Sequence, residues 1–204
     1  MANQDAPFGF RAVGGMGSSY ETQGTSKYQI NDNYGSSIYQ GDVVMTGDGG
    51  TDAGSSTSVA GYIAPAAVGD NNCVGIFNGC LYNDPTTQKP TWKNYYPAST
   101  NITTGYIDAF VYDNPQQLYE VQTAGTLTQS DAGNLIDMAT YAAGSTINGS
   151  SNEEISTASI SNTATFRIIR LSEDPSNSDT SSANSNWIVR FNESIYYDRA
   201  VKTA

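Results

Sequence analysis

Carboxylates are the side chains of this sequence best suited to chemistry, because the chain contains no histidine. Without histidine there can be no Ser-His-Asp or Cys-His arrangement and no histidine-bound zinc. The commonest general base at neutral pH is also missing. Two acid pairs remain, Asp108 with Asp113 and Glu153 with Glu154. Paired acids in a glycosidase need an apolar pocket and a fixed separation. Asp108 alternates with apolar residues and should point out of a sheet, whereas Glu153-Glu154 lies in a polar, turn-rich stretch. We therefore expect no catalytic residues.

Oxygen ligands for a calcium ion occur in two short segments, residues 31–33 and 48–52. Both are rich in Asp, Asn and Gly, which suits flexible loops. Neither has the spacing or the closing Glu of an EF-hand. Acidic loops of this kind are usually just solvated, so the sequence predicts no metal site and no cofactor.

Cys73 and Cys80 are the two cysteines of the chain. If residues 73–82 form one strand, the two Cα atoms lie about 23 Å apart. If Asn78-Gly79 is a hairpin turn, the two cysteines still do not face each other. A disulfide needs Cα atoms within roughly 7 Å, so we expect two reduced, buried thiols.

Aromatic residues form a short cluster at Trp92, Tyr95 and Tyr96. Exposed together, they could anchor a protein interface or stack on sugar rings. Buried, they would be ordinary core or strand-edge packing. The sequence leaves these three interpretations open.

The N-terminal residues combine Pro7, Phe8, Phe10 and Arg11 without any periodicity, and glycines follow. Such a segment cannot build its own core, yet its Phe side chains are costly to leave in water. One interpretation is an extended arm, over residues 1–20, that docks on a neighbouring molecule. The other is a segment that packs on its own domain.

The elements that must position these residues are predicted to be β-strands. Gly, Tyr, Ser, Thr and Asn are abundant, and charged residues make up only 14% of the chain, whereas a helical protein carries more Glu, Lys, Leu and Ala. Short apolar runs alternate with turn residues. Strands are expected at 28–30, 37–39, 42–45, 74–77, 80–82, 106–112, 118–121, 165–171 and 187–196.

Residues 130–141 are the only helix-like window, with Ser130 or Asp131 as a cap and Gly133 weakening it. Residues 172–186 should form an exposed excursion or a disordered loop. Polar tracts near 46–58 and 143–164 separate groups of strands without marking a domain boundary. The prediction is therefore an all-β protein with one domain over residues 21–204, a jelly-roll-like or β-tulip-like sandwich or barrel, and an N-terminal arm.

The net charge of −11 argues against several classes of partner. Nucleic-acid binding depends on Lys and Arg neutralising phosphates, and anionic membranes are disfavoured for the same reason. The start of the chain does not resemble a signal peptide, and no stretch approaches the roughly 20 apolar residues of a membrane span. We expect a protein that is made in a cytoplasm and binds neither nucleic acid nor membrane.

Several blocks, taken in order, resemble a family of virion structural proteins from tailed bacteriophages, including marine phages and cyanophages. The blocks are Asp5-Ala6-Pro7-Phe8-Gly9-Phe10-Arg11, residues 74–80 (Val-Gly-Ile-Phe-Asn-Gly-Cys), residues 95–100, residues 109–115 continuing to 119–122, and residues 166–171. The chain departs from the family pattern at Asn78, where a bulky aromatic is expected, and in its extended tail, residues 198–204.

The resemblance implies a non-enzymatic protein that decorates, or cements, the outside of a capsid built from a separate HK97-fold shell protein. It implies contacts to that shell and to other copies of the chain, and symmetry around capsid axes would favour a trimer. The residues expected at these contacts are Pro7, Phe8, Phe10 and Arg11, followed by Trp92, Tyr95 and Tyr96. Removal of residues 2–11 should then weaken attachment and leave the domain folded. The alternatives are a carbohydrate- or receptor-binding module of a tail or fibre, and an acid-dependent hydrolase.

Overall fold

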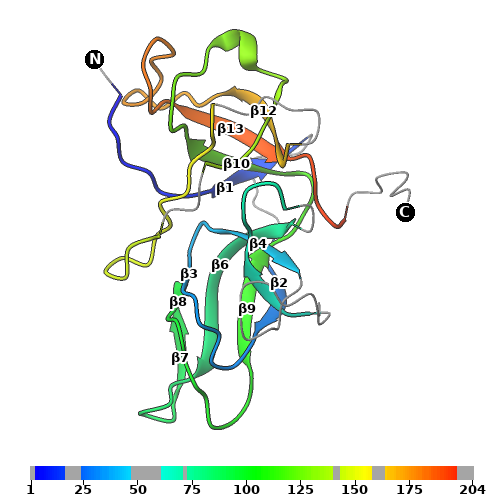
Figure 1. Ribbon diagram of the computed structural model, residues 1–204, viewed down its shortest axis with the longest axis vertical. Helices are drawn as coiled ribbons and strands as arrows, with labels where there is room; N and C mark the ends of the chain where they lie inside the picture. Colours follow the sequence, from blue (N-terminus) through cyan, green and yellow to red (C-terminus); the bar gives the residue numbers. More distant parts are fainter. Residues whose placement is uncertain are drawn as a thin grey trace.

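The computed structural model describes residues 3–16, 24–46, 61–70, 73–139, 143–157 and 164–196. Figure 1 shows two β-layers stacked along the long axis, one sheet in the upper half and a strongly curled sheet in the lower half. No α-helix occurs in the described ranges, where strands and one 3-10 turn, Gln129–Asp131, are the regular elements. The all-β prediction is confirmed.

The lower layer is an antiparallel sheet that closes on itself. Its strand order is β2 (Ser26–Ile30), β9 (Ile107–Tyr112), β6 (Cys73–Asn83), β4 (Val43–Thr46) and β5 (Ile63–Pro65), and β7 (Pro90–Lys93) pairs with the second half of β6. Strand β2 meets the residue before β5 at a parallel bridge between Gln29 and Tyr62, where the Gln29 N–H donates to the Gly61 carbonyl over 2.9 Å. This contact makes the sheet a small barrel. The ribbon of β3 (Ile38–Tyr39) and β8 (Tyr95–Tyr96) adds Ile38 and Tyr96 to its core.

The upper layer is a five-stranded antiparallel sheet, here called sheet A. Its order is β1 (Arg11–Gly15), β10 (Gln117–Gln122), β13 (Asn186–Phe191), β12 (Phe166–Leu171) and β11 (Leu135–Ile136). Alternation along each strand sends Tyr119, Val121, Trp187 and Val189 toward the barrel. This is the sandwich part of the fold.

Two hydrophobic cores lie on opposite faces of the strands β4 and β6. Val43 and Ile76 pack in the core between sheet A and the barrel, whereas the neighbouring Val44 and Phe77 pack inside the barrel. Both faces of these strands are therefore buried, which explains why they read as continuous apolar runs. Burial of each large apolar side chain stabilises the fold by about 1.5–3 kcal/mol. Because two strands serve both cores, the described residues form one domain.

Strand β6 combines two segments that were expected to be separate strands. It runs unbroken through Asn78-Gly79, with a register shift against β9 between Phe77 and Gly79. Cys73 and Cys80 therefore lie on the same strand, and both thiols are buried and free, as expected. Burial raises the pKa of each thiol to about 12, so both are inert as nucleophiles at neutral pH.

The prediction of a helix was wrong, and the prediction for residues 172–186 was correct only in part. The helix-like window holds a single 3-10 turn at Gln129–Asp131, capped by Thr128, and then enters β11. Residues 172–186 form a loop between β12 and β13, as expected, but the loop is ordered and only partly exposed, with Asn177 and Ser185 buried. The short strands β1, β5, β7, β8 and β11 were not expected, and the predicted strand 187–196 ends at Phe191.

The N-terminal segment is extended, and it packs on its own domain. The Asn3 side chain donates to the carbonyls of Asp179 (2.8 Å) and Ala183 (2.7 Å), and the Ala6 N–H donates to Gln122 Oε1 (3.0 Å). Residues 11–15 then join sheet A as β1. Of the two interpretations left open by the sequence, the one with a neighbouring molecule does not describe residues 3–16. The end of the predicted arm, at residue 20, lies outside the described residues.

Candidate functional site

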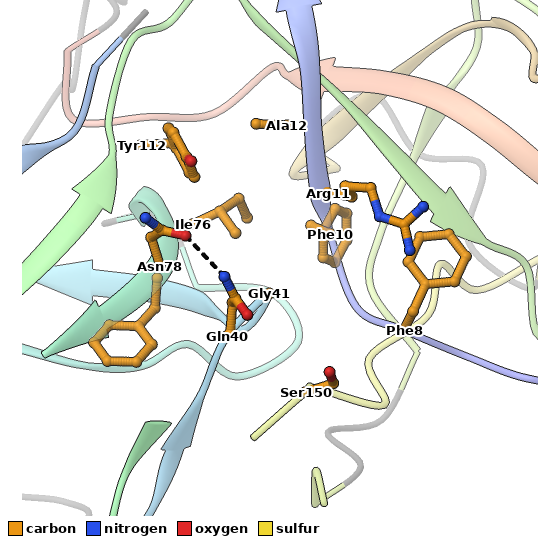
Figure 2. Close-up of a pocket in the computed structure, with 11 residues that line it drawn as sticks. Phe8, Phe10, Arg11, Ala12, Gln40, Gly41, Ile76, Asn78, Tyr112 and Ser150 are labelled. Carbon is orange, nitrogen blue, oxygen red and sulfur yellow. Dashed lines mark hydrogen bonds between the residues drawn. The ribbon is translucent and has the colours of Figure 1, made fainter. Parts of the chain in front are cut away.

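A cavity of about 230 Å³ lies where the N-terminal segment crosses between sheet A and the barrel. Figure 2 shows Phe8, Phe10 and Arg11 on one side of it and Gln40 and Asn78 on the other. The Gln40 Nε2 donates to Asn78 Oδ1 over 2.9 Å. Asn78, where the phage family was expected to have an aromatic, is therefore held at the junction of the two layers.

The four N-terminal contact residues separate into buried and exposed members. Phe10 is 3% exposed and stacks on Phe166, with ring centroids 4.5 Å apart. Phe8 is half-buried, and the Arg11 guanidinium lies 4.4 Å above its ring. Arg11 is well exposed and Pro7 is half-buried. Phe10 is therefore a core residue, and the prediction that it contacts a partner was wrong.

The aromatic cluster of β7 and β8 divides in the same way. Tyr96 is fully buried in the barrel core and donates its hydroxyl to the Tyr34 carbonyl over 3.2 Å. Burial raises its pKa to about 12. Tyr95 is half-buried and stacks on Tyr39 at 5.8 Å. Tyr96 cannot serve a contact to a partner, which corrects that prediction, and Trp92 is the exposed member of the three.

Trp92 belongs to an aromatic surface on the outside of the barrel, which we call the Trp92 surface and define as Leu81, Trp92, Tyr106 and Phe110. Trp92 pairs with Leu81 across β7 and β6, and its ring lies 5.2 Å from that of Phe110 on β9. Tyr106 precedes β9 in the same alternation as Phe110. Trp92 is 50% exposed and Tyr106 is 69% exposed.

The position of the Trp92 ring depends on a residue with no side chain beside it. A Cβ atom at Gly79 would lie 2.6 Å from Trp92 Cζ2. The Trp92 ring can therefore approach β6 this closely only because position 79 is glycine. The result is a rigid apolar surface on strands, which holds side chains more precisely than loops do.

The acid pair Asp108 and Asp113 serves structure and does not form a paired-carboxylate site. Asp108 forms an ion pair with Lys27 at 2.9 Å on the outside of the barrel, as its alternation predicted. Asp113 accepts hydrogen bonds from Ser26 and Tyr28, each at 2.8 Å. These contacts hold β2 against the end of β9.

Glu153 lies in a polar, turn-rich stretch of sequence, yet it is only 2% exposed. Its Oε2 accepts a hydrogen bond from the Val43 N–H over 2.9 Å, which ties residues 143–157 to β4. Burial, and then the neighbouring Asp42 carboxylate, raise the pKa of Glu153 well above its usual value. The half-buried Glu154 also has a raised pKa, from burial and from Asp5. The run of Ser, Asn and Gly around these acids gives no signal of burial.

Glu153→Gln is expected to raise the free energy of unfolding at pH 7 by about 1–3 kcal/mol, the range for relieving a poorly compensated buried group. A raised pKa means that the folded protein holds this proton more tightly than the unfolded chain. The ordinary pKa of a Glu side chain is about 4.5. Wild-type stability should therefore fall as pH rises from that value through the raised pKa of Glu153 in the folded protein. Urea unfolding from pH 4 to 8 measures this, with Glu173→Gln as the exposed control. Equal pH slopes for Glu153→Gln and wild type would contradict it.

The two calcium candidates have different outcomes. Asp32 Oδ1 accepts the Ile102 N–H over 2.8 Å, so this carboxylate is used to fix a turn. Residues 48–52 lie outside the described residues. Within the ranges that are described, no group of three or more acidic or cysteine side chains is placed to hold a metal ion.

Comparison of the chain with protein-family models, curated proteins and solved structures finds no match. Among the described residues, no helix has the length and apolar character to cross a membrane.

Proposed function

We propose that this chain is a non-enzymatic decoration, or cement, protein that binds the outside of a tailed-phage capsid and stabilises contacts between capsomers of its HK97-fold shell. The observation that carries the proposal is the Trp92 surface. It combines a half-exposed Trp with three further apolar side chains on a rigid barrel. Trp and Tyr are the residues most enriched at the energetic centres of protein interfaces.

The sequence blocks that resemble phage virion proteins also support the proposal, because three of them form central strands of the fold. The 74–80 block is the centre of β6, the 109–115 block is most of β9 with its following turn, and the 166–171 block is β12. Most of the apolar residues in these three strands are buried in the two cores. A related framework with a different surface would bind a different shell, which suits proteins that each decorate their own capsid.

A decoration protein works by adding buried area across a junction that internal pressure tends to open. A standard interface buries about 800 Å² per partner, and repetition at every equivalent site multiplies the gain. The Trp92 surface lies on β6, β7 and β9, away from sheet A. The chain can therefore hold the shell with its barrel and present sheet A to neighbouring copies.

Trp92→Ala is expected to weaken binding to capsids at least about thirtyfold, which corresponds to the loss of an interface residue worth about 2 kcal/mol. The assay uses particles of the phage that encodes this chain, stripped of it, with bound protein measured by co-sedimentation over a concentration series. Ile147→Ala is the matched control, because Ile147 is an apolar side chain that is 98% exposed and lies off the barrel strands.

Cryo-electron microscopy of the intact particles provides the second part of this test. Copies on the outer shell at each equivalent site would support the proposal. Particles whose shells hold no copies of the chain, or wild-type affinity in Trp92→Ala, would contradict it.

A carbohydrate-binding module of a tail or fibre is the second candidate. The observation that favours it is the flat, half-exposed Trp92 ring with the ion pair of Asp108 and Lys27 nearby on the same face. An aromatic face beside hydrogen-bonding groups suits stacking on a sugar ring. Glycan binding that is lost in Trp92→Ala, together with a handful of copies per particle, would favour this function over cement.

A further inference from the structure

The cavity beside the N-terminal segment is unusually large for a closely packed fold. Protein interiors contain few voids larger than a water molecule, yet this cavity has a volume of about 230 Å³. An engineered apolar cavity of about 150 Å³ is large enough to bind benzene, whereas sites for drug-sized ligands measure about 300–1,000 Å³. The space therefore fits one aromatic ring better than a whole ligand of that size.

Burial distinguishes the floor of the cavity from its opening. Phe10 and Ile76 are at most 3% exposed and belong to the core between sheet A and the barrel. Arg11 and Gln40 are exposed, so they mark the side that opens to solvent. A group that enters from solvent would pass polar side chains and come to rest on an apolar floor. This combination is the usual form of a binding site.

Aromatic side chains make up the walls of the cavity. Figure 2 shows Tyr112 across the cavity from Phe8, and both side chains are half-buried. The Arg11 guanidinium lies 4.4 Å above the Phe8 ring and holds that ring in place. Rings packed edge-to-face or offset gain stability beyond the area that they bury. A cavity with such walls favours an aromatic guest over an aliphatic one of similar size.

Amide side chains at the edge of the cavity suit the main chain of a polypeptide. Gln40 donates a hydrogen bond to Asn78, and the half-buried Ser150 lies on the same edge. Each amide side chain carries two donor hydrogens and an acceptor oxygen with two lone pairs. The two amides can therefore keep their mutual bond and still bond to peptide groups on either side of a guest ring.

The cavity continues the Trp92 surface along β9. The partly exposed residues of this strand alternate, so Phe110 of the Trp92 surface and Tyr112 of the cavity lie about 7 Å apart. On the neighbouring β6, Gly79 pairs with Phe110, and Asn78 is the extra residue of the register shift beside it. Such bulges re-aim a side chain, and Asn78 lines the cavity. A molecule that covers the Trp92 surface can therefore reach the cavity with an adjacent residue.

We propose that the shell protein inserts one aromatic side chain into this cavity while the residues beside it cover the Trp92 surface. The inference rests on the proposed function and adds the chemistry of the partner, which is an exposed Phe, Tyr or Trp. An aromatic anchor that fills a pocket within a polar rim is the common form of an energetic centre in protein interfaces. A sugar fits less well, because the floor of Phe10 and Ile76 offers its hydroxyl groups no hydrogen-bond partner.

Titration with a small aromatic probe tests the cavity without the phage. N-acetyl-L-phenylalanine amide should shift the backbone NMR signals of Gln40, Asn78 and Tyr112 in a saturable way. Because the walls are aromatic, this probe should bind at least about fivefold more tightly than N-acetyl-L-leucine amide. Equal binding of the two probes, or no saturable shift at these residues, would overturn the inference.

Ser150→Phe and Asn78→Phe each place a ring of the chain itself at the cavity. Each should abolish binding of the probe and weaken binding to stripped capsids at least about tenfold, as expected when a buried interface anchor is excluded. Ser130→Phe is the matched control, because it adds the same ring at an exposed serine that does not line the cavity. Thermal unfolding confirms that each variant is folded.

Trp92→Ala separates this inference from the proposed function. It should lose capsid binding and still bind the probe, because Trp92 does not line the cavity. Loss of capsid binding in Trp92→Ala, with wild-type binding in both Ser150→Phe and Asn78→Phe, would overturn the inference and leave the function standing. A wild type that binds the probe but no capsid would overturn the function and the shell as partner. Self-association or glycan binding of wild type that Ser150→Phe abolishes would also overturn the inference.

Discussion

Phe10→Ala is expected to lower the free energy of unfolding by about 3–5 kcal/mol, the usual cost of truncating a buried Phe. The ring is 3% exposed and stacks on Phe166, which itself packs against Phe191 at 4.7 Å. Its loss leaves a void between the N-terminal segment and sheet A. Urea unfolding followed by tryptophan fluorescence measures the change, because Trp187 lies in the same core.

Phe8→Ala is the matched control for this substitution, since Phe8 is half-buried on the same segment. Its effect should stay at about 1 kcal/mol, the central value for point substitutions. Deletion of residues 2–11 also removes Phe10. It should therefore destabilise the domain as well as weaken attachment to a capsid, whereas the sequence alone predicted that the domain would stay folded. If Phe10→Ala unfolds at the same urea concentration as Phe8→Ala, the segment does not contribute to the core.

Gly75→Val is expected to destabilise the domain by at least about 3 kcal/mol, at the upper end for overpacking, and to reduce the yield of folded protein. A Cβ atom at this position of β6 would collide with the Tyr112 carbonyl oxygen. It would also lie 2.8 Å from the Tyr112 carbonyl carbon and 2.9 Å from Val111 Cγ1. Two of these three atoms belong to the backbone of β9, so no change of rotamer relieves the contact.

Gly35→Val provides the control for this prediction. Gly35 lies in an exposed turn, and a Cβ atom there has no neighbour within 4 Å. The yield of folded protein and the thermal midpoint of both variants measure the difference. Equal midpoints would mean that β6 and β9 do not approach each other as closely as described.

The strands that could be predicted from sequence are those whose own residues carry the pattern. Residues 107–112 alternate in burial along β9 as their types alternate, and β12 and β13 are long apolar runs. The short strands β5 and β8 could not be predicted because two or three residues carry no periodicity. They are strands because β4 and β3 lie beside them.

The candidate contacts were harder to predict than the strands, because burial of one residue depends on distant parts of the chain. Phe10 stacks on Phe166, which is 156 positions away, and Glu153 accepts a hydrogen bond from Val43 of β4, which is 110 positions away. Trp92 and Tyr96 lie four positions apart in one aromatic cluster, yet one is exposed and the other is in the barrel core. Arg11, Arg167 and Arg190 could not be grouped from sequence, because they occur singly in three strands and only the strand register brings them to one face of sheet A.

The order of the strands along the chain sets the order in which the protein can form on the ribosome. The barrel uses residues 26–112 without interruption, so its strands can pair as soon as that stretch has emerged. Sheet A needs β1 from the beginning of the chain and β13 from residues 186–191. Strand β1 can pair with β10 once residues 117–122 have been made, whereas the Phe10 ring gains its partner Phe166 only when β12 follows. The folded barrel beside them is the surface on which that late assembly takes place.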